Sequence, residues 1–381
     1  MTITGPVRGC RHVGFRYPSP RMIRVLHLVD ADADFQTERG AASLSRTLGA
    51  GFSVDTRRLG RGGYRNRAAA VLALRGQSGF DFVHAWGPGA LTTAAMASTK
   101  PIVYSPRPET RRRDVSWARA VMGYRNVEVV CPTATLRRVH VERGVPLERC
   151  HLIRPGVEFG KVRRRRDAAL RAKLGFGDAD HVLLAVGEST RAAAHTDAAW
   201  ATSILNILNP KYRLLVWGRG RYAGKAKRLG DSLGGAKLVT LAEHAPGPVE
   251  FEELLPAADT VLVTSMGATA TLPVSIAMAA GLPIVATVTY TTSELLEDRH
   301  TALMTPPAVP RRLARRVLDL HEDASLQWSI ADMARTEAYE FFSFTRFVEQ
   351  FRTVYQQAAG GQPVVIPEQA AGAGLRFHGR A

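Results

Sequence analysis

The chain has 381 residues, of which 45% are apolar and 22% are charged, and its formal net charge at pH 7 is +17. This length and composition predict a soluble globular protein with two domains of ordinary size. No apolar run in the sequence approaches the ~20 residues that a membrane-spanning helix needs. Any membrane contact is therefore predicted to be peripheral.

The three cysteines are too few and too widely spaced for a disulfide framework or a zinc site. They indicate a reducing cytoplasm and a protein without a metal centre. The positive charge comes mainly from arginines that are spread along the whole chain, and no nucleic-acid reading motif accompanies them. Solvated arginine faces therefore explain the charge better than specific nucleic-acid binding.

The N-terminal part begins with a leader and continues as a domain of alternating strands and helices. Residues 1–21 carry four arginines and no acidic residue but lack the apolar core of a signal peptide, so they are predicted to be disordered. The following domain is predicted to span residues 22–158. Its buried strands are short, rich in β-branched residues and followed by helical patterns, as in a parallel sheet, and they lie at 22–29, 80–86, 101–105 and 127–132.

The C-terminal part opens after a charged segment at residues 159–180, which contains four consecutive arginines and is predicted to be an interdomain linker. The second domain is predicted to span residues 181–339. Its apolar strands at 181–186 and 212–217 each end in glycine. Residues 359–381 read as a disordered tail.

One stretch of the second domain, residues 261–305, reads as strand, loop, helix, strand, helix, strand. Pro273 is predicted to open the first helix, because its fixed φ suits a first turn, and Gly281 is predicted to close it in a left-handed conformation. The loop at 265–272 then lies at the carboxyl end of a parallel strand and at a helix N-terminus. Ligands of open α/β sheets bind in that crevice, and anions favour the helix start.

The residues 277–285, Ala-Met-Ala-Ala-Gly-Leu-Pro-Ile-Val, closely resemble the donor-site pattern of the GT-B glycosyltransferases, in particular the family-4 (group 1) retaining enzymes. The order of elements over about residues 22–358 resembles the same family. The resemblance implies two Rossmann-like domains that face a cleft, the first for the acceptor and the second for the nucleotide-sugar donor. It also implies that a last helix, at 340–358, crosses back onto the first domain.

The sequence departs from this family pattern at the charged positions that hold the donor. The resemblance places Ala268 and Ile276 at two glutamate positions, where one glutamate acts near the sugar and the other holds the ribose. Glu188 and Ala193 stand where the family has an arginine and a lysine that neutralise the diphosphate. A carboxylate beside a diphosphate repels it by ~1 kcal/mol or more even in partly screened surroundings.

The resemblance also implies which residues form the site. His84 is the candidate catalytic residue, and the packed core histidine is the competing interpretation. Acceptor contacts are expected at Gly40, His84, Trp86 and Arg107. Donor contacts are expected on four loops, at Gly187, Arg191, His195, Gly218, Arg219, Gly220, Ser265, Thr271, Leu272 and Glu294, with Arg191, His195 or Arg219 as replacements for the missing cations. Glu294 reads equally well as an ordinary acid in a first helical turn.

These observations predict a metal-independent retaining hexosyltransferase that uses a nucleotide-sugar as substrate and no cofactor. The alternative is a non-catalytic GT-B subunit that binds or scaffolds an active transferase, and the four departures at Glu188, Ala193, Ala268 and Ile276 favour it. The sequence leaves open the acceptor and whether the partner is a protein or a membrane surface. An arginine-rich nucleic-acid-binding protein, whose binding would weaken steeply with salt, is the third and weakest interpretation.

Overall fold

The structure is a computed structural model, and it describes residues 22–60, 64–77, 79–163, 165–218, 220, 222–244, 250–268 and 271–360. The predicted leader and nearly all of the predicted tail lie outside these residues. The described chain contains two parallel six-stranded sheets with helices on their faces, as the sequence predicted. Within the described part, none of the helices is long and apolar enough to cross a bilayer. A cytoplasmic location stays a prediction.

The first sheet has the strand order β2-β1-β3-β4-β5-β6, and all neighbouring strands are parallel. Its central strands are buried on both faces because helices cover both sides. The strands are β1 (Ile23–Val29), β2 (Phe52–Arg58), β3 (Phe82–Trp86), β4 (Ile102–Ser105), β5 (Val127–Cys131) and β6 (Cys150–Leu152). The helices are α1 (Phe35–Thr47), α2 (Tyr64–Leu74), α3 (Pro88–Ala97), α4 (Arg112–Met122) and α5 (Ala134–Glu142).

The second sheet has the strand order β12-β11-β10-β7-β8-β9. The strands are β7 (His181–Ala185), β8 (Tyr212–Val216), β9 (Val239–Leu241), β10 (Thr260–Val263), β11 (Ile284–Thr287) and β12 (Leu303–Thr305). The helices are α6 (Ala168–Lys173), α7 (His195–Leu208), α8 (Ala223–Gly234), α9 (Phe251–Leu254), α10 (Thr271–Ala280), α11 (Thr292–Leu295), α12 (Pro310–Glu322) and α13 (Ala324–Phe341). The strand order reverses between β7 and β10, and open α/β sheets bind ligands at such a reversal.

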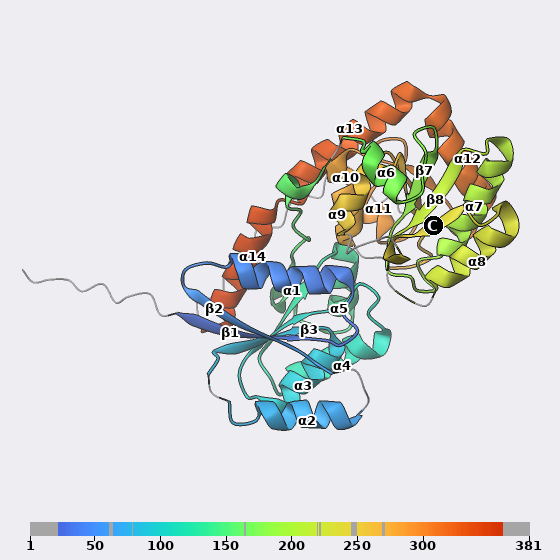
Figure 1. Ribbon diagram of the computed structural model, residues 1–381. Helices are drawn as coiled ribbons and strands as arrows, with labels where there is room; N and C mark the ends of the chain where they lie inside the picture. Colours follow the sequence, from blue (N-terminus) through green and yellow to red (C-terminus); the bar gives the residue numbers. More distant parts are fainter. Residues whose placement is uncertain are drawn as a thin grey trace, which may run out of the picture.

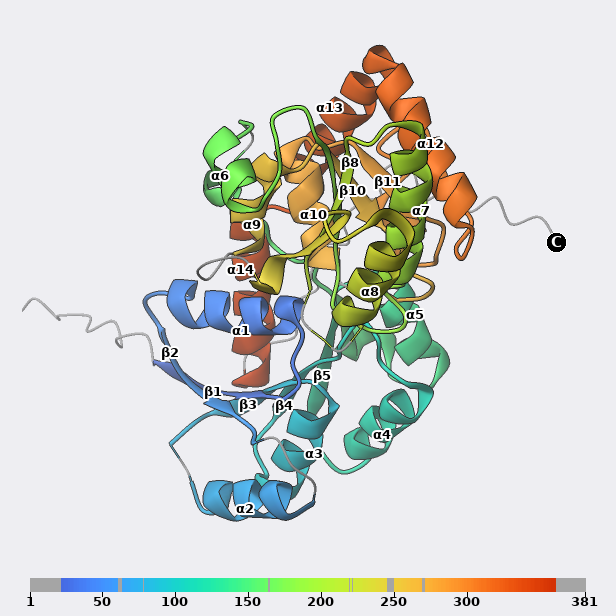
Figure 2. The ribbon, with the colours of Figure 1, turned by 45° about the vertical axis from the view of Figure 1, so that its right-hand side comes forward.

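The last helix, α14 (Phe344–Ala358), follows α13 and packs against the first sheet (Figure 1). Its apolar face joins the core that β1, β3 and α1 form, through Phe347, Phe351, Val354 and Tyr355. The expected crossing of the last helix onto the first domain is therefore present. In both ribbon views α1 lies between the first sheet and the second domain (Figure 2).

Two local details differ from the expectations. Helix α10 begins at Thr271, two residues before Pro273, whereas Gly281 does close it with a φ of 64°. The predicted linker contains α6, whose fully buried Arg171 binds the second domain through Asp259, so much of this segment packs as part of that domain.

Candidate functional site

A polar cleft of about 1000 Å³ lies between the two domains at the carboxyl ends of strands from both sheets. The loop after β7 and the loop after β10 form one wall, at the strand-order reversal of the second sheet. The loops after β1, β3 and β4 form the other wall. Its lining includes Asp30, Asp32, Asp34, Gly89, Arg107, Glu109, Arg113, Gly187, Glu188, Thr190, Arg191, Ala193, Gly220, Ser265 and Ala268.

Three predicted glycines hold the loops of the second domain close together. Gly187, Gly218 and Gly220 have φ values of 122°, 140° and 139°, which side chains rarely allow. A Cβ atom on Gly218 would lie 1.8 Å from the carbonyl oxygen of Gly187, and one on Gly220 would lie 2.6 Å from that of Ser189. These glycines therefore shape the site by letting its backbone segments touch.

The predicted replacement cations differ in what they can do. Arg191 is exposed and lines the cleft, where its permanent charge is available. His195 is 2% exposed, and its Nδ1 lies 3.2 Å from Ser189 Oγ. Burial lowers the pKa of His195 to about 4, so this ring is neutral at pH 7 and cannot replace a cation. Arg219 lies outside the described residues.

The loop after β10 reaches the cleft through Ser265 and Ala268, as expected for the donor side. The N–H groups of Thr271 and Leu272 open α10, but both donate to the side-chain oxygen of Gln36 from the first domain. Ile276 is 2% exposed and packs in the apolar core of the second domain. At the position where the resembled family has its ribose-binding glutamate, this chain thus has a core residue.

Two glutamates of the second domain, Glu188 and Glu294, bind helix N-termini of the first domain. The Glu188 carboxylate accepts a hydrogen bond of 2.9 Å from the N–H of Phe35, at the start of α1. The Glu294 carboxylate accepts from the N–H groups of Ala134 and Thr135, at the start of α5. Negative side chains are stabilised at helix N-termini. Glu294 lies in a separate pocket and does not line the cleft.

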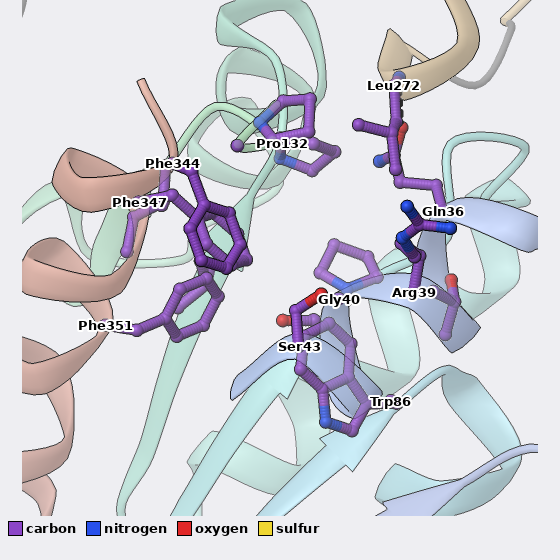
Figure 3. A pocket seen from close by; sticks show the side chains of 17 residues that line it. Gln36, Arg39, Gly40, Ser43, Trp86, Pro132, Leu272, Phe344, Phe347 and Phe351 are labelled. Carbon is purple, nitrogen blue, oxygen red and sulfur yellow. Dashed lines mark hydrogen bonds between the residues drawn. The ribbon is translucent and has the colours of Figure 1, made fainter. Parts of the chain in front are cut away.

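The predicted acceptor residues are divided between two places. Gly40 and Trp86 line a narrow cavity of about 50 Å³ between α1 and α14, together with Phe344, Phe347 and Phe351 (Figure 3). A Cβ atom on Gly40 would lie 3.1 Å from the Trp86 ring. Gly40 therefore allows α1 to pack on Trp86. Arg107, by contrast, lines the large cleft.

His84 is fully buried and lines neither of these two spaces. Its Nδ1 lies 2.5 Å from the Tyr355 hydroxyl and its Nε2 lies 2.9 Å from Ser105 Oγ. His27 Nε2 lies 2.8 Å from the same tyrosine hydroxyl. Burial keeps the pKa of His84 well below its ordinary value. The geometry is that of a packed, neutral core histidine, and its partner Ser105 lines the narrow cavity and not the large cleft.

The sequence reasoning missed a set of carboxyl groups on the wall of the first domain. Asp30 is 4% exposed and accepts a hydrogen bond of 3.1 Å from the N–H of Gly89. Burial raises the pKa values of Asp30, Asp34 and Glu109. Arg107 forms an ion pair with Asp32 at 2.9 Å and so lies among these carboxyl groups. The available signal was the acidic segment that follows the first strand, at residues 30–34. The sequence alone does not show that it lies beside a cleft.

Comparison with known proteins finds a family model that matches the second domain. The model of the family "Glycosyl transferases group 1" matches residues 167–337. A D-inositol 3-phosphate glycosyltransferase from Paenarthrobacter aurescens (strain TC1) is 28% identical over 306 residues, which are 78% of this chain and 73% of that protein. The matched family segment contains the loops after β7, β8 and β10.

Solved structures share the fold. HepE from Anabaena, crystallised with UDP and glucose, superposes with a TM-score of 0.73 at 17% identity and covers 88% of this chain and 100% of its own. The sucrose-phosphate synthase of Thermosynechococcus elongatus gives a TM-score of 0.69 at 16% identity over 88% and 98% of the two chains. WaaG, a glycosyltransferase involved in lipopolysaccharide biosynthesis, gives 0.68 at 16% identity over 89% and 100%. The chain has the GT-B fold, and residues 167–337 in its second domain match the model of the group 1 glycosyl transferases.

Proposed function

We propose that the protein transfers a sugar from a nucleotide-sugar to an acceptor, with the donor bound in the interdomain cleft. The observation that carries the proposal is the position of this cleft at the strand-order reversal of the second sheet, with one wall from the matched family segment. The HepE structure with UDP and glucose supports a uridine nucleotide as the first donor to test.

Within this proposal the second domain holds the diphosphate and the first domain holds the acceptor. Arg191, on the loop after β7, faces the cleft and supplies the positive charge that the leaving diphosphate needs, so the proposed reaction is metal-independent. We propose transfer of a hexosyl group with retention, which the sequence resemblance to the family-4 enzymes supports. On the opposite wall Asp30 lines the cleft, and its carboxylate would accept a hydrogen bond from the acceptor hydroxyl and orient it toward the sugar.

The test is titration calorimetry of the full chain with UDP, GDP, ADP and their sugar conjugates at two salt concentrations. We expect micromolar binding of one nucleotide. Arg191→Ala should weaken that binding about tenfold, since a charge-assisted contact contributes about 1.5–3 kcal/mol. Arg75→Ala, an exposed arginine that does not line the cleft, is the matched control and should bind like the wild type. Equal affinities of all three proteins would remove Arg191 from the donor site.

A second candidate is the non-catalytic GT-B subunit, and two observations favour it. Ile276 is buried in the core, where no ribose contact is possible for an alkyl side chain, and Glu188 places a carboxylate on the wall of the cleft. Failure of every nucleotide to bind at millimolar concentration would support this candidate over the transferase. The partner would then be sought among active glycosyltransferases.

A further inference from the structure

The first turn of α1 enters the second domain and is held there by both backbone and side chain. The ring of Phe35 lies 4.8 Å from that of Trp217, centroid to centroid, and 6.4 Å from that of Phe251. The N–H of Phe35 donates to Glu188 of the loop after β7. Aromatic contacts at these distances are favourable beyond their buried area. The second domain therefore fixes the position of the next residue, Gln36.

Gln36 occupies the N-terminus of α10 with a single oxygen atom. Its Oε1 accepts hydrogen bonds from the N–H of Thr271 at 2.8 Å, from the N–H of Leu272 at 2.9 Å and from Thr271 Oγ1 at 2.9 Å. The first N–H groups of a helix have no partner within the helix and attract ligand oxygens. Pro273 has no N–H to offer. Both backbone donors at the opening of α10 are therefore taken by the chain itself.

The same arrangement recurs at two other helix starts beside the domain boundary. Glu294 of the second domain binds the N-terminus of α5, and Glu188 binds that of α1. Arg39 of α1 adds ion pairs to Glu250 at 3.0 Å and to Glu252 at 2.5 Å. These contacts join the two domains in a closed arrangement in which the helix N-termini are satisfied from within the chain.

We propose that Gln36 is an intramolecular competitor of the donor. Its amide oxygen stands where a phosphate or sugar oxygen of the nucleotide-sugar would accept hydrogen bonds from α10, so the donor gains full contact only after α1 withdraws from the second domain. This inference rests on the proposed function and assumes that the bound donor extends from the cleft, which Ala268 lines, to the start of α10 three residues further along the chain. In the closed arrangement, Gln36 of the same chain therefore occupies the place of the donor.

Two substitutions at this position are expected to act in opposite directions. Gln36→Ala removes the competing oxygen and keeps a good helix former in α1, so nucleotide affinity should rise about tenfold. Gln36→Glu places a carboxylate at the N-terminus of α10, where negative charge is favoured, and affinity should fall. Gln356→Ala, the same change at an exposed site on α14, is the matched control and should leave affinity unchanged.

Titration calorimetry with UDP, GDP and ADP and small-angle X-ray scattering without nucleotide test the inference separately. A Gln36→Ala protein that binds nucleotide equally or more weakly overturns it, because Gln36 would then be neutral or part of the donor site. If neither the wild type nor Gln36→Ala binds a nucleotide, the proposed function fails. The scattering measurement then still tests whether Gln36 holds the two domains together. A larger radius of gyration for Gln36→Ala than for wild type supports the closing role, whereas an unchanged radius contradicts it.

Discussion

Arg171 is the residue whose structural role is least visible in its local sequence. Its guanidinium is fully buried in the second domain, where it donates to Asp259 Oδ2 at 3.1 Å, to the Ala257 carbonyl at 3.0 Å and to the carbonyls of Gly177 and Asp180. A buried charge is tolerated only when it is paired and hydrogen-bonded, as the two Nη atoms are here. Arg171 thereby fastens α6 to the strand that begins with Thr260.

Replacing this arginine is expected to destabilise the protein strongly. Arg171→Met removes the buried guanidinium that donates to Asp259 and to three carbonyl groups, and the free energy of unfolding should fall by about 3–5 kcal/mol. Arg166 contacts the same Asp259 at 3.3 Å but is half exposed, so Arg166→Met should cost less than about 1 kcal/mol. Chemical denaturation of both variants checks this. Similar losses of unfolding free energy in the Arg171 and Arg166 variants would show that burial does not determine the contribution of these arginines.

Residue roles such as those of Arg171 and Gln36 could not be predicted from the sequence because each depends on partners far away in the chain. Gln36 and Thr271 are separated by 235 positions, and no local pattern marks the amide as a cap for another domain's helix. His84 shows the opposite case. Its place at a strand end was predictable, but its burial under α14 was not. The glycines at 187, 218 and 220 were predictable from their type and position, because a close approach of backbones requires glycine.

At the scale of elements, the hydroxyl group of Tyr355 joins the otherwise apolar face of α14 to the first sheet. The Tyr355 hydroxyl lies within 2.8 Å of His27 Nε2 and within 2.5 Å of His84 Nδ1. A hydroxyl donates one proton and accepts others, so it can satisfy both rings in a directed chain. The contact orients α14 on β1 and β3.

Removing this hydroxyl should weaken the attachment of α14 without changing its shape. Tyr355→Phe leaves two buried ring nitrogens without a partner, which should lower the free energy of unfolding by about 1–3 kcal/mol. Tyr339→Phe on α13 is half exposed and should change it by less than about 0.5 kcal/mol. Thermal unfolding followed by circular dichroism compares the two. A stable Tyr355→Phe protein would mean that packing alone holds the helix.

The elements themselves were largely predictable. Short apolar runs ending in glycine or polar residues predicted most of the parallel strands, and the family resemblance predicted the last helix, α14. The short α6 shows the limit, because its charged sequence read as a linker while its packing depends on one buried arginine. Similarly, the first turn of α10 precedes the proline that was expected to open it, since Gln36 satisfies its N–H groups from outside.

At the scale of the whole molecule, buried histidines link stability to pH. Burial lowers the pKa of His27 to about 3 and the pKa values of His195 and His321 to about 4, and it lowers those of His84 and His140 as well. In the unfolded chain these groups titrate near 6.5. Between pH 6.5 and about 4 the unfolded state therefore binds more protons than the folded state. Stability falls as pH falls through this window.

We expect the melting temperature to drop between pH 7.5 and pH 5.5, with each such histidine contributing at most about 1.4 kcal/mol per pH unit. Carboxyl groups with raised pKa values, such as Asp30, act in the opposite sense between their ordinary and their raised pKa, so they offset part of the drop at the acidic end of this range. His195→Asn should reduce the slope, whereas the exposed His244→Asn should not. A melting temperature that is constant over this range would contradict the assignment.

The packing of α14 on the first sheet has a consequence for how the protein is made. The core around β1 is completed by a helix that begins at residue 344, so the ribosome must synthesise the whole second domain before that core can close. Until then the nascent first domain keeps apolar side chains such as Phe82 and Trp86 without their final cover. Unpartnered surface of this kind is prone to aggregate and to engage chaperones. The second domain, whose strands and helices are contiguous in the sequence, is free to fold earlier.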